Sequence, residues 1–303
     1  MQRIFDSRQL LAFTTLSRLG SFTQTAKELA LTQSAISHAI KTLEDDVGCK
    51  LVERGSKKVV LTQAGEVFLS HVERSLSAMV TARDELDAMS VWGQGRLRIG
   101  ASSTTCQYIL PTVLREFRQC FPKCAISIES GDQPRQLELL MNNQIDVALM
   151  LEPMRYRELD YIPLFKDELR FVVPSAHPWA KLSRVAPEKV TEETLLMYNK
   201  TSATSRMVGE HFRQERIQPA AIIELASMEA IKELVRVGLG VGVIAPWVCK
   251  AELSQGMLIS LPIGRNPLER SWGIAQVKGR SPRLGEEVFV GLCKTVTEGI
   301  GKL

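Results

Sequence analysis

The sequence has no long hydrophobic run and no export signal. No run of about 18 apolar residues occurs anywhere in the 303 residues, so we expect no helix that spans a membrane. The first residues, MQRIFDSRQLLAF, do not have the architecture of a signal peptide, because charged residues interrupt their apolar positions. With 45% apolar and 24% charged residues, the chain can bury more than one core, and we expect a cytoplasmic protein.

Cysteine is scarce and scattered. The six cysteines stand at positions 49, 106, 120, 124, 249 and 293. Cys120 and Cys124 are four apart, but Pro122 lies between them and no histidine cluster accompanies them. We therefore expect buried thiols in a reducing compartment rather than a zinc site or disulfides.

Enzyme signatures are also missing. The histidines, at positions 38, 71, 177 and 211, lie far apart, and no Gly-x-Ser-x-Gly occurs. The glycine-rich segment 238–242 is no dinucleotide loop, because a predicted helix over 229–237 precedes it and a predicted strand over 242–244 follows. Gly238 is expected to end that helix. We predict no catalytic residue, no metal and no cofactor.

A two-helix pattern is present at residues 21–43. Within 32–45 the apolar positions fall at i, i+3, i+4 and i+7, as in a helix packed on a small core: Ile36, Ala39, Ile40 and Leu43. The opposite face carries Gln33, Ser34, Ser37, His38 and Lys41, and Thr32 is the predicted N-cap. Such side chains can reach base edges or phosphates when a helix lies in a major groove. The alternative is the solvated face of an ordinary surface helix.

A predicted β-hairpin with a basic tip follows at residues 50–62. Leu51 and Val52 would pair with Val59 and Leu61, around a turn at Gly55-Ser56. Arg54, Lys57 and Lys58 would place an arginine near a minor groove and lysines near phosphates. The first 64 residues carry +3 of the chain's net charge of +4, as expected if this part alone meets nucleic acid. The alternative is a solvated edge strand kept from aggregating by charge.

A long helical pattern covers residues 63–89. Its apolar positions follow a heptad seam in which Arg83 occupies one place: Leu69, Val72, Leu76, Met79 and Leu86. We predict a helix that forms a homodimer, whose paired heads would read a pseudo-palindromic operator in double-stranded DNA. The alternative is a helix that packs on its own body. Residues 91–95 are predicted to form a hinge.

From residue 96 onward predicted strands alternate with predicted helices, which indicates an α/β architecture with parallel sheets. The first part has strands over 97–101, 125–129 and 146–151 and helices over 109–121 and 134–142. The second has strands over 168–173, 193–197, 221–225 and 242–244 and helices over 206–214 and 229–237. Strands over 258–262 and 272–276 and a closing helix over 283–298 follow.

Four hydroxyl residues, Ser102 to Thr105, stand between a predicted strand and a predicted helix. Backbone N–H groups and hydroxyls at the carboxyl end of a strand can hold a carboxylate or phosphate. The alternative is a plain helix N-cap.

Several stretches resemble LysR-type transcriptional regulators. The most specific is LLAFTTLSRLGSFTQTAKELALTQSAISHAIKTLEDDVG; LVERGSKKVVLTQAGE, RLRIGASSTT with LPTVLREFRQCFP, and VGLGVGVIAP support it. The chain departs from the family pattern at His38, Val52 and Gln63; Gln63 lacks the preset first helical turn that proline gives. The resemblance implies a winged helix-turn-helix over 1–62, a linker helix over 63–92 and an effector domain over 93–303. That domain would have two subdomains, about 93–163 with 269–303 and about 164–268. Two crossovers would join them, as in periplasmic binding proteins.

The resemblance also implies the sites and partners. A small effector, which we expect to be an anionic metabolite, would bind between the subdomains at Ser102, Ser103, Thr104, Thr201, Ser202, Ser227 and Met228. Loop solvation of Thr201 and Ser202 and a helix cap at Ser227 are the alternatives. DNA would contact Thr32, Gln33, Ser34, Ser37, His38, Lys41, Arg54, Lys57, Lys58 and Thr62. We also expect the chain to form a homotetramer and to contact RNA polymerase. Other readings are a cysteine redox sensor or a DNA-tethered enzyme.

Overall fold

The computed structural model describes residues 4–54, 58–89, 95–153 and 157–300. The chain divides into two units, one of Met1–Trp92 with Met141–Gln144 and one of the remaining residues. In the described ranges, no helix combines the length and the apolar character that crossing a bilayer requires.

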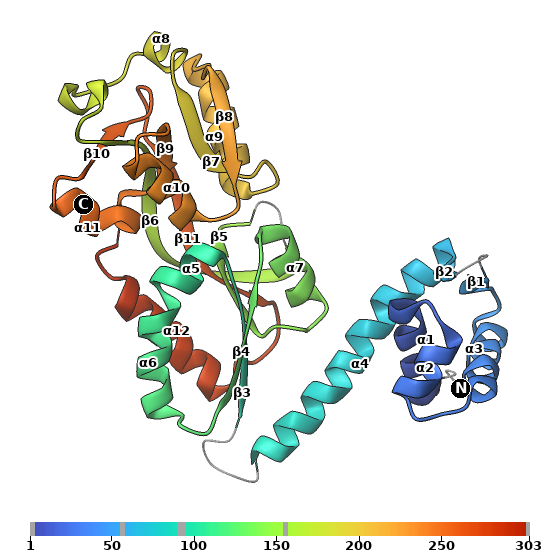
Figure 1. Cartoon of the computed structure of the whole chain (residues 1–303). Helices are drawn as coiled ribbons and strands as arrows, with labels where there is room; N and C mark the ends of the chain where they lie inside the picture. Colours follow the sequence, from blue (N-terminus) through green and yellow to red (C-terminus); the bar gives the residue numbers. More distant parts are fainter. Residues whose placement is uncertain (1–3, 55–57, 90–94, 154–156, 301–303) are drawn as a thin grey trace. The chain divides into compact units, whose positions relative to one another are not determined.

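Three helices and a hairpin form the amino-terminal unit, and a long helix follows them (Figure 1). The elements are α1 Ser7–Leu19, α2 Phe22–Glu28, α3 Gln33–Val47, β1 Val52–Arg54, β2 Val59–Leu61 and α4 Gln63–Met89. Glycines in the left-handed region end α1 and α3: Gly20 has a φ of 62° and Gly48 a φ of 83°. The core collects residues from α1, α3, the hairpin and α4, including Phe13, Leu16, Ile36, Ile40, Leu43 and Leu51.

The α3 prediction is confirmed. Thr32 Oγ1 accepts a hydrogen bond from the backbone N–H of Ala35 at 3.2 Å, which is an N-cap. Ile36, Ile40 and Leu43 are buried, whereas Ala39 is half-buried.

The hairpin is confirmed, with Val52 opposite Leu61 and Arg54 opposite Val59. A buried carboxylate fixes it to α3: Glu44 accepts hydrogen bonds from the backbone N–H groups of Leu51 at 2.9 Å and Val52 at 3.2 Å. Lys58 is exposed. The expected tip residues Gly55, Ser56 and Lys57 lie outside the described residues, as does the side chain of Arg54.

The helix α4 has the predicted bounds, but its predicted seam is only partly available to a partner. Val72 is 3% exposed in the core of the amino-terminal unit, and Leu69 and Leu76 pack against that core. This part of the prediction is wrong, because the small helix-turn-helix needs α4 to close its core. Met79 is 54% exposed, so apolar surface is free further along the helix. The side chain of Leu86 lies outside the described residues.

The second unit contains a nine-stranded sheet in the order β4-β3-β5-β11-β6-β9-β7-β8, with β10 paired to β6. Parallel strands form its two ends: β3 Arg96–Ala101, β4 Ala125–Ser130 and β5 Val147–Leu151 at one, and β7 Thr194–Tyr198, β8 Ala221–Leu225 and β9 Val241–Ile244 at the other. Between them run the antiparallel strands β6 Leu159–Pro174 and β11 Leu268–Val277, beside β10 Leu258–Pro262. The two-part α/β fold is therefore confirmed.

The strands β6 and β11 are the two crossovers, and both are longer than the predicted strands 168–173 and 272–276. The sequence pattern broke at polar positions such as Asp167 and Arg270, which the structure buries together. Periodicity therefore found only the most apolar end of each strand.

Helices cover the sheet around separate cores in each half (Figure 1). They are α5 Ser103–Tyr108, α6 Leu110–Cys120, α7 Gln133–Met141, α8 Pro187–Val190, α9 Ala203–Glu215, α10 Met228–Arg236, α11 Lys250–Ser254 and α12 Leu284–Thr297. The predicted helix over 109–121 is preceded by α5, a short helix that the sequence did not indicate. The short helices α8 and α11 were not predicted either.

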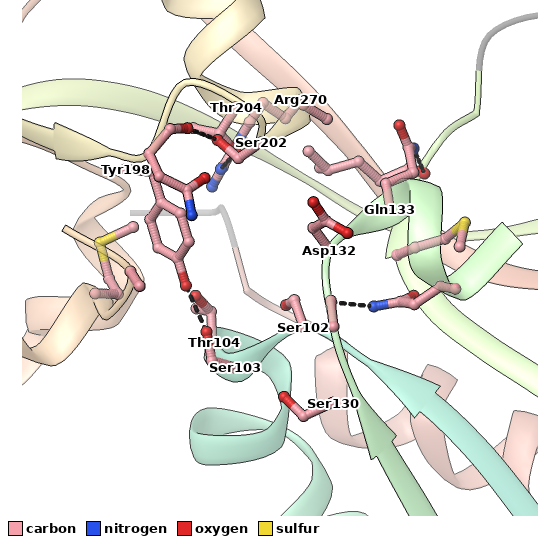
Figure 2. Close-up of a pocket in the computed structure, with 18 of the residues that line it drawn as sticks. Ser102, Ser103, Thr104, Ser130, Asp132, Gln133, Tyr198, Ser202, Thr204 and Arg270 are labelled. Carbon is pink, nitrogen blue, oxygen red and sulfur yellow. Dashed lines mark hydrogen bonds between the residues drawn. The ribbon is translucent and has the colours of Figure 1, made fainter. Parts of the chain in front are cut away.

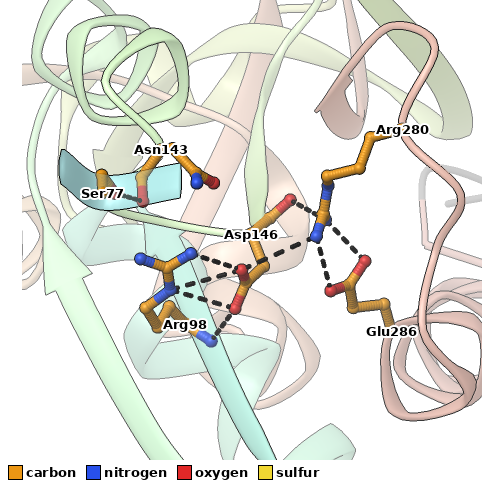
Figure 3. A network of polar contacts seen from close by, with 6 residues as sticks. All are labelled: Ser77, Arg98, Asn143, Asp146, Arg280 and Glu286. Atoms are coloured by element: carbon orange, nitrogen blue, oxygen red, sulfur yellow. Dashed lines mark hydrogen bonds and ion pairs between the residues drawn. The ribbon is translucent and has the colours of Figure 1, made fainter. Parts of the chain in front are cut away.

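A polar network ties the first strand of this unit to its last helix (Figure 3). Asp146 accepts hydrogen bonds from the backbone N–H of Arg98 at 2.8 Å and from its guanidinium at 2.7 Å. Arg280 bonds the Asp146 carbonyl and pairs with Glu286. Burial disfavours the charge on Asp146, but the bonds from Arg98 outweigh it and lower its pKa, whereas burial raises the pKa of Glu286.

The cysteine prediction is only partly correct. Cys124, Cys249 and Cys293 are buried, but Cys49 and Cys120 are exposed and Cys106 is half-buried. All six thiols are free.

Candidate functional site

The outward face of α3 presents the predicted polar residues. Gln33, Ser34, His38 and Lys41 are exposed and Ser37 is half-buried. The hydroxyls of two predicted DNA-binding residues already cap helices. Thr32 caps α3, and Thr62 Oγ1 caps α4 by accepting a hydrogen bond from the backbone N–H of Gly65 at 3.0 Å. The Thr62 cap replaces the preset turn that a proline at position 63 would give.

A cavity of about 350 Å³ lies in the second unit, lined from both subdomains and from a crossover strand. Figure 2 shows hydroxyl residues of the β3–α5 junction on one side and the start of α9 on the other. Its lining residues are Ser102, Ser103, Thr104, Ser130, Gly131, Asp132, Gln133, Gln136, Met150, Leu151, Tyr198, Asn199, Ser202, Ala203, Thr204, Ala226, Met228, Val248, Arg270 and Trp272.

Five of the seven predicted effector residues line this cavity: Ser102, Ser103, Thr104, Ser202 and Met228. Thr201 and Ser227 are not among its lining residues. Thr201 donates a hydrogen bond to Asn199 Oδ1 at 3.1 Å, and Ser227 caps α10 through the backbone N–H of Ala230. Thr201 is exposed, so for these two residues the structure matches the alternatives of loop solvation and helix capping.

The lining hydroxyls differ in what they already bind. Ser102 Oγ caps α5, and Ser202 Oγ caps α9 by accepting a hydrogen bond from the backbone N–H of Ser205 at 3.0 Å. Ser103 Oγ contacts the hydroxyl of Tyr198 in the other subdomain (Figure 2). Thr104 is 6% exposed, and within the described residues its hydroxyl makes no hydrogen bond.

The one cationic side chain among the described lining residues is neutralised. Arg270 donates from Nε to Asp167 Oδ1 at 2.9 Å and from Nη2 to Oδ2 at 2.5 Å, and its Nη1 donates to Thr204 Oγ1. The indole N–H groups of Trp247 and Trp272 also donate to Asp167 Oδ2. This charge pair therefore shapes the cavity without leaving a free positive charge in it.

Contacts between α5 and α10 join the subdomains beside the cavity. The Tyr108 hydroxyl donates to Glu229 at 2.6 Å, and Gln107 donates to the same carboxylate. Lys232 pairs with Glu229 and Glu252, both at 2.9 Å. Burial and the bond to Glu229 raise the pKa of Tyr108 to about 12, so its hydroxyl stays protonated and remains a donor.

Sequence reasoning missed Asp132, Gln136, Tyr198 and Arg270. One signal was available for Asp132: Gly131 and Asp132 follow the parallel strand β4, as Ser102 follows β3, and neighbouring parallel strands end at one edge of a sheet. Arg270 gave no such signal, because its partner Asp167 is far away in the sequence.

Two family models match the chain. One is the LysR substrate binding domain, over residues 93–298, and the other is the bacterial regulatory helix-turn-helix protein, lysR family, over residues 7–66.

Individual proteins and structures resemble the chain over nearly its whole length. It is 30% identical to the HTH-type transcriptional activator CmpR of Synechocystis, over 93% of this chain and 92% of that protein. It is 33% identical to the HTH-type transcriptional regulator CfxR of Cupriavidus necator, over 92% of this chain and 87% of that protein. The crystal structure of ArgP from Mycobacterium tuberculosis matches with a TM-score of 0.73 at 20% identity, covering 98% of this chain and 99% of that chain.

Proposed function

This chain belongs to the LysR family of transcriptional regulators, and from that premise we propose how its two units act. The amino-terminal unit binds double-stranded DNA, and the effector-binding unit takes a small molecule that controls transcription. The observation that carries the proposal is the cavity of about 350 Å³, because its walls come from both subdomains. A ligand held by both walls favours one arrangement of the subdomains and shifts their equilibrium.

For DNA binding we propose that α3 lies in the major groove. Its exposed side chains Gln33, Ser34 and His38 would face base edges, and Lys41 and Thr32 would face phosphates. Arg54 and Lys57 of the hairpin would contact the neighbouring minor groove and backbone, together with Lys58. Thr62 would act through its cap of α4, which positions the hairpin.

For the effector we propose that Ser103, Thr104 and Ser202 provide the first polar contacts, beside Ser102 and Met228. Thr104 is the strongest of these because the residue is only 6% exposed at the cavity wall. The anionic character expected from the hydroxyls stays a prediction, since Asp167 already balances the charge of Arg270. Thr201 and Ser227 would support the site through Asn199 and α10.

We propose a regulator without catalysis or cofactor. The named relatives are transcriptional regulators, and four of the six thiols do not suit a cysteine sensor. A peroxide sensor needs a thiol of low pKa, whereas burial raises the pKa of Cys106, Cys124, Cys249 and Cys293.

We propose a homodimer formed through the free part of α4, around Met79 and Val80, which are both more than half exposed. Paired dimers would give the homotetramer, which binds a pseudo-palindromic operator. Such an assembly would work in the bacterial cytoplasm, where it meets DNA and RNA polymerase.

The test is selection of genomic fragments by the full-length protein at moderate salt, against random competitor DNA. We expect enrichment of a pseudo-palindromic site and a footprint that His38→Ala and Lys41→Ala weaken. Footprints repeated with a metabolite library should then reveal a compound that alters the protected bases. If the protein prefers no fragment over random DNA, the proposed function is wrong.

A further inference from the structure

A buried oxygen at the wall of the effector cavity has no hydrogen-bond partner. Gln136 lies on α7, is 1% exposed and lines the cavity. In the described part of the chain its Oε1 is a buried side-chain atom without a partner. A buried acceptor left without a donor costs free energy comparable to a lost hydrogen bond. A ligand that donates a hydrogen bond to this oxygen would remove that cost.

The orientation of this amide is fixed by its neighbour. Gln136 Nε2 donates to the carbonyl oxygen of Gly131 at 2.9 Å, and a carbonyl can only accept. Rotating the amide by half a turn would set two oxygens against each other. The atom left for a ligand is therefore the oxygen, which demands an N–H or O–H group from whatever fills the cavity.

An exposed carboxylate also lines the cavity, that of Asp132, whose Oδ1 accepts a hydrogen bond from the backbone N–H of Arg135 at 3.3 Å. Asp132 precedes α7 and is four residues before Gln136, so the two share a face of the helix, and both line the cavity. Figure 2 shows the Asp132 carboxylate pointing into the cavity. The nearby guanidinium groups are occupied, because Arg135 pairs with Glu138 at 2.8 Å and Arg270 pairs with Asp167.

From these two acceptors we infer that the effector carries an amine, which binds as an ammonium group between Asp132 and Gln136 Oε1. A hydroxyl would satisfy Gln136 alone, whereas an ammonium group supplies several donors and also balances the charge of Asp132. The oxygens of the same ligand would then face the hydroxyls and the Asn199 amide on the opposite wall. The effector class is thus a small amino-bearing metabolite. This inference rests on the proposed effector role of the cavity.

The experiment uses the full-length protein and matched pairs of probes: the proteinogenic L-amino acids with their des-amino carboxylic acids, and putrescine with butane. Melting temperature is measured first, and calorimetric titration follows for any compound that raises it. We expect at least one amine to raise the melting temperature while its amine-free analogue does not.

Variants then locate the contact. Asp132→Asn and Gln136→Leu should each weaken binding of that amine by about tenfold or more, as for loss of a charge-assisted hydrogen bond. Asp160→Asn is the matched control, because Asp160 is an exposed acid of the same unit that is not among the lining residues.

The inference is overturned if no amine raises the melting temperature, if an amine-free analogue binds equally well, or if Asp132→Asn leaves the affinity unchanged. A gel-shift assay on the same preparations separates the two claims. Operator binding that responds only to a ligand without an amine keeps the proposed function and removes this inference. Amine binding without any specific DNA binding keeps this inference and removes the proposed function.

Discussion

Arg270 and Asp167 face each other across the two crossover strands, and each is only 4% exposed. They are paired residues of β11 and β6, the strands that join the subdomains. A charge buried here is tolerated because its opposite charge and two indole donors lie against it. The pair therefore fixes the strands next to the cavity.

The first prediction concerns loss of the negative charge that balances Arg270. Asp167→Asn leaves the guanidinium of Arg270 buried without a counter-charge, so we expect the free energy of unfolding to fall by about 3–5 kcal/mol. Urea denaturation followed by tryptophan fluorescence measures it, since Trp247 and Trp272 touch the site. Glu168→Gln is the control, because Glu168 pairs with Arg170 at 3.4 Å near the surface and should cost about 1 kcal/mol or less. Equal losses in the two variants would contradict the prediction.

The second prediction concerns the carboxylate that fixes the hairpin. Burial disfavours the charged form of Glu44, but hydrogen bonds from Lys50, Leu51 and Val52 outweigh it and lower its pKa from 4.5. A lowered pKa in the folded state gives stability that is present above the unfolded pKa and lost as the pH falls through the folded pKa. We expect Glu44→Gln to lower stability at neutral pH by about 1–3 kcal/mol and to flatten the loss in acid.

Thermal melts by circular dichroism, at pH values from about 7 to about 3, measure this dependence. Asp45→Asn serves as the control, since Asp45 is exposed on the same helix. An acid limb that Glu44→Gln leaves as steep as in the natural protein would show that another group controls it.

Much of the amino-terminal unit could be predicted from the sequence because its signals are local. The cap at Thr32, the apolar stripe of α3 and the glycine that ends it at Gly48 all lie within one helix length. The hairpin followed from the apolar residues Val52, Val59 and Leu61, but its register did not, because a turn at Gly55-Ser56 would set Val52 opposite Val59 whereas Val52 lies opposite Leu61. The burial of Val72 was not predicted, because a heptad seam has the same pattern whether it faces a partner or its own chain.

Residue patterns alone predicted the cavity on one side only, whereas Ser202 and Met228 on the other side came from the family resemblance. The hydroxyls after β3 follow a rule about strand ends, so Ser103 and Thr104 were accessible to sequence reasoning. Arg270 and Asp167 were not, because their pairing depends on the register of two strands far apart in the sequence. Gln136 looks like any polar residue of an amphipathic helix until its burial is known.

The third prediction separates the two parts of α4. Val72→Ala should lower the melting temperature of the amino-terminal unit, at a cost of about 1–3 kcal/mol, because Val72 lies in its core. Met79→Glu should instead weaken the homodimer, because a charge would replace apolar surface that is 54% exposed in the single chain. Sedimentation velocity over a range of protein concentrations measures the dimer. A dimer unaffected by Met79→Glu would place the interface elsewhere.

The fourth prediction concerns the hairpin as a DNA-binding wing. Arg54→Ala should weaken operator binding, because a guanidinium near the minor groove and phosphates contributes to affinity by releasing counterions. The slope of log affinity against log salt should become less steep by about 1, the change expected for loss of one phosphate contact. Fluorescence anisotropy with a labelled operator, measured at several salt concentrations, gives both quantities. Arg115→Ala is the matched control, because Arg115 is an exposed arginine of the second unit that pairs only with its neighbour Glu116 among the described residues. If Arg54→Ala lowers affinity with no change in slope, the arginine does not act through phosphates, and the wing assignment then depends on Lys57 and Lys58 alone.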